Sequence, residues 1–177
     1  MAEAKTGAAR TIDGKGKTVQ ELLNAKRYSI DYYQREYKWE TKQISELIDD
    51  LSTKFLQSYD PKHERSAVET YGHYFLGSII ISDKDGRKFI IDGQQRLTSL
   101  TLLLTYLYHR LTDADHRGQI AELIFSQRFG KKAFNLDVEE RNECMDALLA
   151  GKHFDANDQP ESVVNILAWL IHQPTGS

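Results

Sequence analysis

Residues 89–100, with the sequence FIIDGQQRLTSL, constrain the fold of this chain more than any other segment. An apolar run of β-forming residues ends at Asp92 and Gly93, and a long pattern typical of a helix begins directly after it. The first turn of a helix has unpaired N–H groups and a partial positive charge, which together attract phosphate. The sequence therefore predicts a strand, a tight turn and a helix N-terminus that can bind an anion.

Each residue of this turn has a role to offer at an anion site. Gly93 would let the backbone turn and approach a ligand closely. Arg96 lies in the first helical turn, where a cation opposes the helix dipole, so its position makes more sense if an anion receives the guanidinium group. Gln94 and Gln95 add neutral donors, and Asp92 can hold a metal ion, a ribose hydroxyl or a water molecule. The alternative is an ordinary helix with Asp92 as its N-cap and Arg96 in solvent.

A second informative segment, residues 32–39, mixes aromatic and basic side chains. Such a mixture can stack on bases or purine rings while its cations pair with phosphates. Gln34 and Arg35 are not natural core residues, so between aromatic neighbours they indicate the wall of a polar pocket. The alternative is an aromatic cluster that closes the edge of the domain, a role expected in part for Tyr37 and Trp39.

Three segments of the chain resemble the GmrSD N-terminal domain family, which belongs to the ParB-like and sulfiredoxin-like fold group. Residues 90–104 are similar to its DGQQR signature, residues 33–39 to its YQR-x-Y-x-W segment, and residues 74–80 to its FLGSI strand. The resemblance covers residues 19–172. The chain departs from the family around Tyr-Gln-Arg, where it has Asp31, Tyr32 and Glu36 at positions that are often proline in the family.

The resemblance implies that the Tyr-Gln-Arg loop faces the DGQQR turn and shares one cleft with it. The expected chemistry is nucleotide binding with Mg²⁺-assisted hydrolysis, in which Asp92 holds the metal ion or a water. The expected catalytic residues are Asp92, Gln94, Gln95 and Arg96, and the expected phosphate contacts are Gly93, Gln94, Arg96 and Arg35. The expected pocket for the nucleotide or for modified DNA consists of Tyr33, Gln34, Arg35 and Tyr37. His73, Ser78 and Thr98 are further candidates to line this cavity.

Length and composition fit a single domain that folds without disulfide bonds or other cross-links. The chain has 177 residues, of which 40% are apolar and 28% charged, as in ordinary globular proteins. The single cysteine, Cys144, cannot form an internal disulfide, and its helical setting indicates a packed or half-exposed thiol more than a catalytic one. Residues 1–17 lack the apolar stretch of a signal peptide, and no run approaches the length of a membrane span. A cytoplasmic protein without a membrane partner is expected.

The net charge of −3 argues against a protein that holds nucleic acid by a general basic field. A local basic site remains open, because several basic residues fall in or beside the three motifs. These residues are Arg27, Arg35, Lys38, Lys42, Arg87, Lys88 and Arg96. Folding could gather them on one face, or they could be spread over a solvated surface.

Periodicity and turn signals predict an α+β domain with a small mixed sheet, packed helices and a helical C-terminal part. The resemblance implies that this domain is of the ParB/sulfiredoxin-like type. Helices are expected at 19–25 with a Thr18–Glu21 capping box, at 41–55 with Thr41 as cap, at 94–111, 118–126, 138–150 with Asp137 as cap, and 161–172. Strands are expected at 27–30, 73–82, 87–92 and 133–136, with a loop at 59–72 and a hairpin turn at 83–86. The helix at 94–111 is apolar on most sides and should be buried. Residues 1–17 are expected to be flexible, 18–172 to form the domain and 173–177 to be a tail.

By resemblance, the chain is expected to be the nucleotide-hydrolysing regulatory domain of a bacterial anti-phage, modification-dependent restriction protein. It would gate a separate HNH-type nuclease domain, so the chain is expected to be a fragment of a longer protein. The implied partners are a nucleoside triphosphate, phosphorothioated or base-modified DNA and, as one option, a second copy of the chain. Nuclease activity in this chain is not expected. One alternative is a module without turnover that reads a modified DNA backbone at the same anion site, and another is a purely structural domain.

Overall fold

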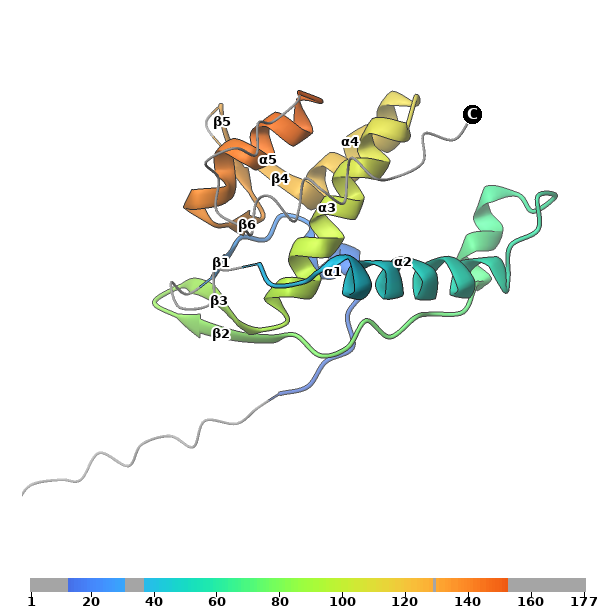
Figure 1. Ribbon diagram of the computed structural model, residues 1–177, viewed down its shortest axis with the longest axis horizontal. Coiled ribbons are helices and arrows are strands. Elements are labelled where there is room, and N and C mark those ends of the chain that lie inside the picture. Colours follow the sequence, from blue (N-terminus) through green and yellow to red (C-terminus); the bar gives the residue numbers. More distant parts are fainter. Residues whose placement is uncertain (1–12, 31–36, 129, 153–177) are drawn as a thin grey trace, which may run out of the picture.

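A four-stranded mixed sheet with a long helix packed on it forms the centre of the computed structural model, which describes residues 13–30, 37–128 and 130–152 (Figure 1). The strands are β1 (Tyr28–Ile30), β2 (Ile80–Lys84), β3 (Arg87–Asp92) and β6 (Leu136–Asp137), in the order β2-β3-β1-β6. Strand β1 is parallel to β3 and β6, and β2 is antiparallel to β3. The predicted α+β class with a small mixed sheet is confirmed.

The β2–β3 hairpin is closed by a two-residue turn. Lys84 pairs with Arg87, and the residues between them, Asp85 and Gly86, have φ angles of 55° and 74°. Two successive positive φ angles are the requirement of a type I′ turn, which Asp-Gly satisfies at low cost. The hairpin predicted from this dipeptide is confirmed.

Strand β2 is shorter than the strand predicted at residues 73–82, because it begins only at Ile80. Gly77 has a φ of 95°, which is incompatible with extended backbone. The carbonyl of the next residue, Ser78, accepts a hydrogen bond from a side chain, Nη1 of Arg96, at 3.0 Å. Residues 73–79 therefore belong to no strand, and Ser78 among them contacts the start of the long helix.

That helix, α3 (Gln94–Arg110), runs through the middle of the molecule (Figure 1). Leu97, Leu100 and Leu102 are buried, as its apolar pattern predicts. Hydroxyl groups are buried with them: Oγ1 of Thr101 donates to the carbonyl of Leu97, four residues earlier, at 2.9 Å. Leu107 is 40% exposed, so the prediction of a buried helix is right for its second turn and wrong for its last turn.

Both hydrophobic clusters of the described chain use α3. One cluster contains Leu97 and Leu100 with residues of α1, β1 and β3, and the other contains Leu102 with Tyr37 and residues of the C-terminal part. The helix therefore connects the sheet to the rest of the domain.

The first two helices differ from expectation mainly at their starts and ends. Helix α1 (Val19–Leu23) has the predicted capping box, in which the N–H of Glu21 donates to Oγ1 of Thr18 at 3.1 Å. Helix α2 (Thr41–Leu56) is preceded by Glu40 as its N-cap, so the prediction of Thr41 as the cap is wrong. Helix α2 runs away from the sheet (Figure 1). Beyond its C-terminal end, a short 3₁₀ helix, η2 (Arg65–Thr70), lies within the segment predicted as a loop, residues 59–72.

The described C-terminal part is less helical than predicted. Helix α4 (Ala114–Ile124) begins earlier than expected and is followed by a second sheet of β4 (Phe125–Arg128) and β5 (Lys131–Phe134). Asp137 lies in β6 and caps no helix, and the predicted helix at 138–150 is divided into η3 (Glu139–Arg141) and α5 (Asn142–Leu149).

The strand predicted at 133–136 is divided because Asn135 stands between β5 and β6 in a buried position. Its Nδ2 donates to the carbonyls of Leu23 at 3.0 Å and Glu122 at 2.9 Å. Buried polar groups need such partners, so these bonds hold α1 and α4 at this point of the chain.

Some predictions fall outside the described residues. These are the helix at 161–172, the tail at 173–177 and, up to residue 12, the flexible start. Among the residues that are described, no helix combines the length and apolar character needed to cross a bilayer.

The thiol of Cys144 should be almost unreactive in the folded chain. It is buried, as predicted, and burial raises its pKa to about 11. Because the thiolate is the reactive form, alkylation by iodoacetamide at pH 8 should be roughly 100-fold slower than for a free cysteine. Mass spectrometry of timed samples measures this rate, with urea-unfolded protein as the control. Equal rates in the folded and unfolded chain would contradict the buried placement.

Candidate functional site

The turn between β3 and α3 is formed by Gly93 in the left-handed conformation. Gly93 is the N-cap of α3, with a φ of 88°, which most side chains disfavour. A Cβ at this position would also lie 2.9 Å from Cγ1 of Ile79 and 3.3 Å from the carbonyl oxygen of Ser78. Only glycine satisfies both conditions. The alternative in which Asp92 caps the helix is therefore wrong.

Asp92 is the last residue of β3, and its side chain is exposed beside the helix N-terminus. No residue in the described ranges is a partner of its carboxylate. Within those ranges there is also no group of three His, Cys, Asp or Glu residues that could hold a metal ion. Mg²⁺ is often held by one or two carboxylates together with substrate phosphates and water. Asp92 fits that arrangement, in which the nucleotide completes the coordination.

The two glutamines of the turn have different surroundings. Oε1 of Gln95 accepts a hydrogen bond from the backbone N–H of Lys38 at 2.9 Å. Oε1 of Gln94 is buried and has no hydrogen-bond partner among the residues described. Gln95 therefore joins α3 to the segment that follows the Tyr-Gln-Arg loop. Oε1 of Gln94 can still accept a hydrogen bond from a bound group.

Arg96 lies with its guanidinium group against the backbone of residues 77–78. Its Nη1 donates to the carbonyl of Ser78 at 3.0 Å, and a Cβ on Gly77 would come within 2.8 Å of its Cζ. The solvated Arg96 of the alternative interpretation is wrong, because the side chain is half-buried in this contact. Its role with an anion stays a prediction.

Tyr37 and Trp39 belong to the core, as expected in part from the sequence. Tyr37 is 2% exposed, and Trp39 packs against the same hydrophobic cluster. The Tyr37 hydroxyl lies 2.7 Å from Oγ of Ser99. Because Ser99 donates its only hydrogen to the carbonyl of Gln95 at 3.0 Å, Tyr37 is the donor of this bond. The end of the aromatic segment therefore contacts the second turn of α3.

Tyr33, Gln34 and Arg35, the other residues predicted for the nucleotide or modified-DNA pocket, lie outside the described residues. The described neighbours Tyr37 and Lys38 do contact α3. The predicted cleft lies between the Tyr-Gln-Arg loop and the DGQQR turn. The structure describes one part of it, the contact of residues 37–38 with α3.

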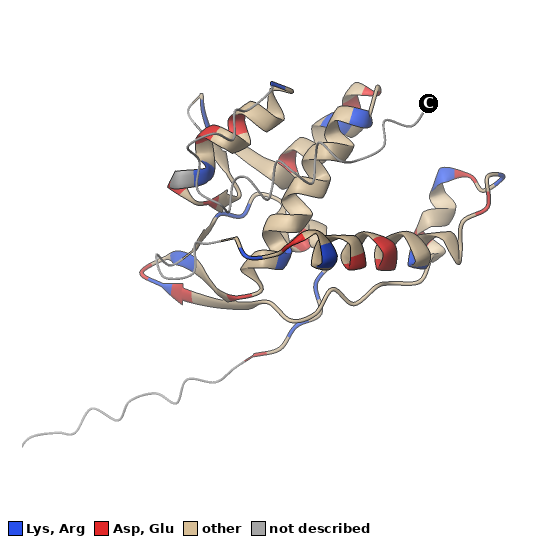
Figure 2. Cartoon of the chain, in the orientation of Figure 1, with Lys and Arg blue, Asp and Glu red and all other residues tan. Residues whose placement is uncertain are grey.

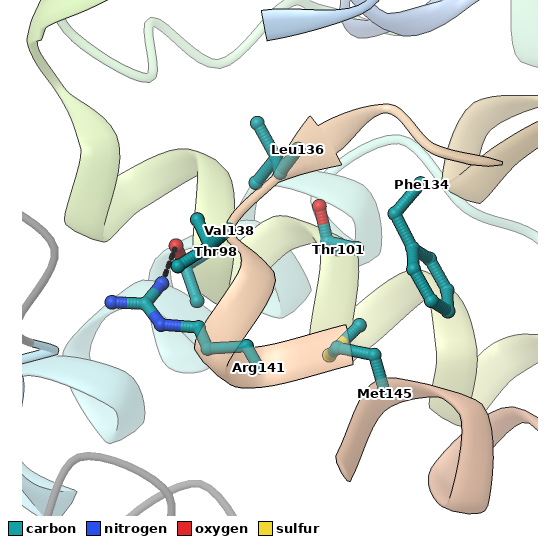
Figure 3. A pocket seen from close by; sticks show the side chains of 7 residues that line it. All are labelled: Thr98, Thr101, Phe134, Leu136, Val138, Arg141 and Met145. Carbon is teal, nitrogen blue, oxygen red and sulfur yellow. Dashed lines mark hydrogen bonds between the residues drawn. The ribbon is translucent and has the colours of Figure 1, made fainter. Parts of the chain in front are cut away.

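A small cavity lies beneath α3, one turn beyond the DGQQR residues (Figure 3). It has about 20 Å³ of room for the centre of a water-sized sphere, which is enough for one water molecule and too little for a nucleotide. It is lined by Thr98, Thr101, Phe134, Leu136, Val138, Arg141 and Met145. Of the three residues suggested as lining, Thr98 lies here, whereas His73 and Ser78 do not line this cavity.

Arg141 is a residue of this region that the sequence analysis missed. Its guanidinium group donates to Oγ1 of Thr98 at 3.1 Å and lies 5.9 Å from the centre of the Tyr37 ring. The signal was present, because Val138, Arg141 and Met145 follow the 3-and-4 spacing of a buried helical face. An arginine at such a position is unusual and indicates a specific partner.

Basic residues do not gather on one face of the described chain. Figure 2 shows Lys and Arg on several elements, with Asp and Glu between them. Arg27 pairs with Asp137 at 2.9 Å and Lys88 with Asp83 at 3.0 Å. The interpretation of a spread, solvated set of charges is favoured over a basic patch.

The contact between Gly77 and Arg96 should be essential for stability. Gly77→Ala introduces a Cβ into the guanidinium group at a φ of 95°, which should lower the free energy of unfolding by about 2 kcal/mol or more. Gly118→Ala in α4 is the control: nothing lies within 4 Å of its Cβ position, so a gain of up to about 1 kcal/mol is expected. Urea denaturation measures both.

Adding Arg96→Ala to Gly77→Ala should remove the clash and leave only the backbone strain. The double variant should therefore lose less stability than the sum of the two single losses. Strictly additive losses would show that the two residues do not touch.

The burial of Tyr37 should make stability depend on pH. Burial raises the pKa of Tyr37 above its ordinary value, and the Ser99 bond and the charge of Arg141 oppose this. A group whose pKa is raised on folding stabilises the protein below its unfolded pKa, about 10, and loses this contribution as pH rises through the folded pKa. Tyr37→Phe should cost about 1 kcal/mol at pH 7, and wild type should approach the variant above pH 10.

Urea denaturation of wild type and Tyr37→Phe between pH 7 and 11 measures this difference. Tyr59→Phe is the control, because Tyr59 is 46% exposed and stacks on Phe55 through its ring. A stability difference between wild type and Tyr37→Phe that does not change with pH would contradict the raised pKa of the buried Tyr37 hydroxyl.

Comparison with known proteins gives one result for the whole domain. No curated protein matches the chain significantly. Residues 19–171 match the family model described as the N-terminal domain of the GmrSD restriction endonuclease. The matched range contains the three segments whose described residues meet at the first turns of α3. The match confirms the family that the motifs indicate: this chain belongs to the GmrSD restriction endonuclease N-terminal domain family.

Proposed function

We propose that this chain binds a nucleoside triphosphate at the first turn of α3 and hydrolyses it with Mg²⁺. The observation that carries the proposal is an exposed Asp92, without a partner among the described residues, directly before the left-handed Gly93 at the start of a 17-residue helix. No acidic residue lies in the first turn of α3, so its positive end is not neutralised from within that turn. A phosphate chain at this turn would meet backbone N–H groups and the helix dipole together.

The side chains of the turn would divide the remaining work. Mg²⁺, when bound by Asp92 and the phosphates, supplies neutralisation of the charge on the phosphate oxygens. Gln95, whose Oε1 accepts from Lys38, would lie beside the phosphates and help to orient them or a water molecule. Gln94 would serve in the same way. Arg96 uses one N–H for Ser78, and others of its five donors would stabilise charge that develops on the transferred phosphoryl group.

In a restriction protein of this family, this hydrolysis would regulate a separate nuclease domain of the HNH type that cuts modified DNA. The family membership supports a place in a restriction system. The setting would be the bacterial cytoplasm, where the system acts against phage DNA.

A second function, reading of a modified DNA backbone without turnover, is favoured by one observation. Two of the four proposed catalytic side chains, Gln95 and Arg96, are bonded to backbone groups of neighbouring segments. They therefore serve the shape of the turn, which a binding module needs as much as an enzyme does. The same anion site would then hold a DNA phosphate or phosphorothioate.

Phosphate release from GTP, ATP, CTP and UTP in Mg²⁺ tests the proposal. Asp92→Asn should lower turnover at least about tenfold, because it removes the charge that holds the metal ion and leaves the side-chain shape unchanged. Asp49→Asn is the matched control, since Asp49 is exposed on α2 and does not belong to the turn. Chelation of Mg²⁺ should also stop turnover.

Three results distinguish the alternatives. Turnover that is lost in Asp92→Asn and kept in Asp49→Asn supports the hydrolase. Wild type without turnover on any nucleotide means that the hydrolase proposal is wrong for this chain. Binding of modified DNA by such an inactive wild type, weakened moderately by salt, would support the reader instead.

A further inference from the structure

Arg141 places a positive charge in the interior of the domain. It is the last residue of η3 and directly precedes α5, and only 6% of it is exposed. Moving a charged group out of water is costly unless the group is well hydrogen-bonded. A buried arginine is therefore retained for a contact that an apolar side chain could not make.

The contacts of Arg141 lead to α3 and to the aromatic segment. Figure 3 shows its guanidinium group bonded to the hydroxyl of Thr98, at 3.1 Å from Nη1 to Oγ1. The same group lies 5.9 Å from the centre of the Tyr37 ring, within the range of a cation–π contact. Tyr37 in turn donates to Ser99. Arg141 thus contacts Thr98 directly and Ser99 through Tyr37. These are two successive residues of the second turn of α3.

Those two residues lie directly below the glutamines of the DGQQR turn. Residues four apart share one face of a helix, so Thr98 lies below Gln94 and Ser99 below Gln95. Oγ of Ser99 also donates to the carbonyl of Gln95 at 3.0 Å. The rotation of the first turn about the helix axis is therefore coupled to the contacts that Arg141 makes from the C-terminal part.

The side chain of Arg141 is not closely packed on one side, so its polar contacts contribute strongly to its position. The water-sized cavity adjoins its side chain on the side of Phe134 and Met145 (Figure 3). A side chain beside a void is not fixed by close packing on that side. The bond to Thr98 and the contact with the Tyr37 ring are therefore among the interactions that place the guanidinium group.

We infer that Arg141 is a positioning residue of the site at the start of α3: through Thr98 and Tyr37, it fixes the first two turns of this helix. The inference rests on the proposed function for its catalytic consequence, and on the described contacts alone for its structural one. A displacement of about 1 Å in groups that orient a reacting phosphate can cost on the order of 100-fold in rate. Loss of Arg141 should therefore lower kcat at least tenfold and change KM little.

The test compares Arg141→Met with two controls in the full chain. Met145→Ala is the stability control, because Met145 is buried and lines the same cavity but makes no bond to α3 polar groups. Arg110→Met is the charge control, because Arg110 is exposed at the far end of α3. Each variant is measured for kcat and KM of phosphate release, and for hydrogen exchange of the α3 amides at residues 97–101. Circular dichroism selects a temperature at which all variants are folded.

The inference predicts a kcat at least tenfold lower in Arg141→Met, with exchange at residues 97–101 at least tenfold faster. Arg141→Lys should recover part of both, because it keeps a cation near the Tyr37 ring, and it replaces Arg141→Met if that variant does not fold. Met145→Ala and Arg110→Met should resemble wild type in kcat. Unchanged kcat in the Arg141 variants, or an equal loss in Met145→Ala, would overturn the inference.

Failure of the proposed function is a separate result. If wild type releases no phosphate, the hydrolase proposal fails, and the exchange measurement alone decides the role of Arg141. Faster exchange at residues 97–101 in Arg141→Met but not in Met145→Ala would then support positioning of the turn. Equal exchange in the two variants would overturn it.

Discussion

The close approach of residues 77–79 to the first turn of α3 is the contact on which this site depends. It is possible because Gly77 and Gly93 both adopt positive φ angles, 95° and 88°. A Cβ on Gly93 would lie 2.9 Å from Ile79, and one on Gly77 would lie 2.8 Å from Arg96. At Gly93 a side chain would meet Ile79 and the backbone of Ser78, and at Gly77 it would displace the guanidinium group of Arg96 from Ser78. Both glycines therefore support the position of the start of α3.

Around this contact, the same hydrogen bonds build the fold and shape the candidate site. Arg96 bonds to Ser78, Gln95 to Lys38, and Tyr37 to Ser99. Each bond joins two of the three motif segments, which gives a structural reason for their occurrence together. A residue of a motif can therefore be required for folding whether or not it also touches a ligand, and Arg96 is the clearest case. Asp92 is different: it is exposed and makes no described contact, so chemistry is the simpler reason for its presence.

Local features of this structure could be predicted from the sequence, and distant contacts could not. The Asp85-Gly86 hairpin turn, the Thr18–Glu21 box and the strand-turn-helix at Asp92-Gly93 depend on neighbouring residues whose backbone preferences are known. The burial of Arg141 depends on Thr98, 43 residues away, and the break at Asn135 on Leu23, 112 residues away. The partner of Arg96 is the backbone of Ser78. A carbonyl carries no sequence signal, so an anion was the more visible partner for that cation.

The central claim is that the first turn of α3 binds the phosphates of a nucleotide. It is tested most directly by following the backbone amides in ¹H–¹⁵N NMR spectra while a nucleoside triphosphate with Mg²⁺ is added. If nucleotide phosphates bind there, the largest shifts should occur at Gly93 and Gln94 and should saturate with nucleotide concentration, because their N–H groups lie at the positive end of the helix. Saturating shifts confined to other elements, such as the β4–β5 hairpin, or no shifts at all, would contradict it.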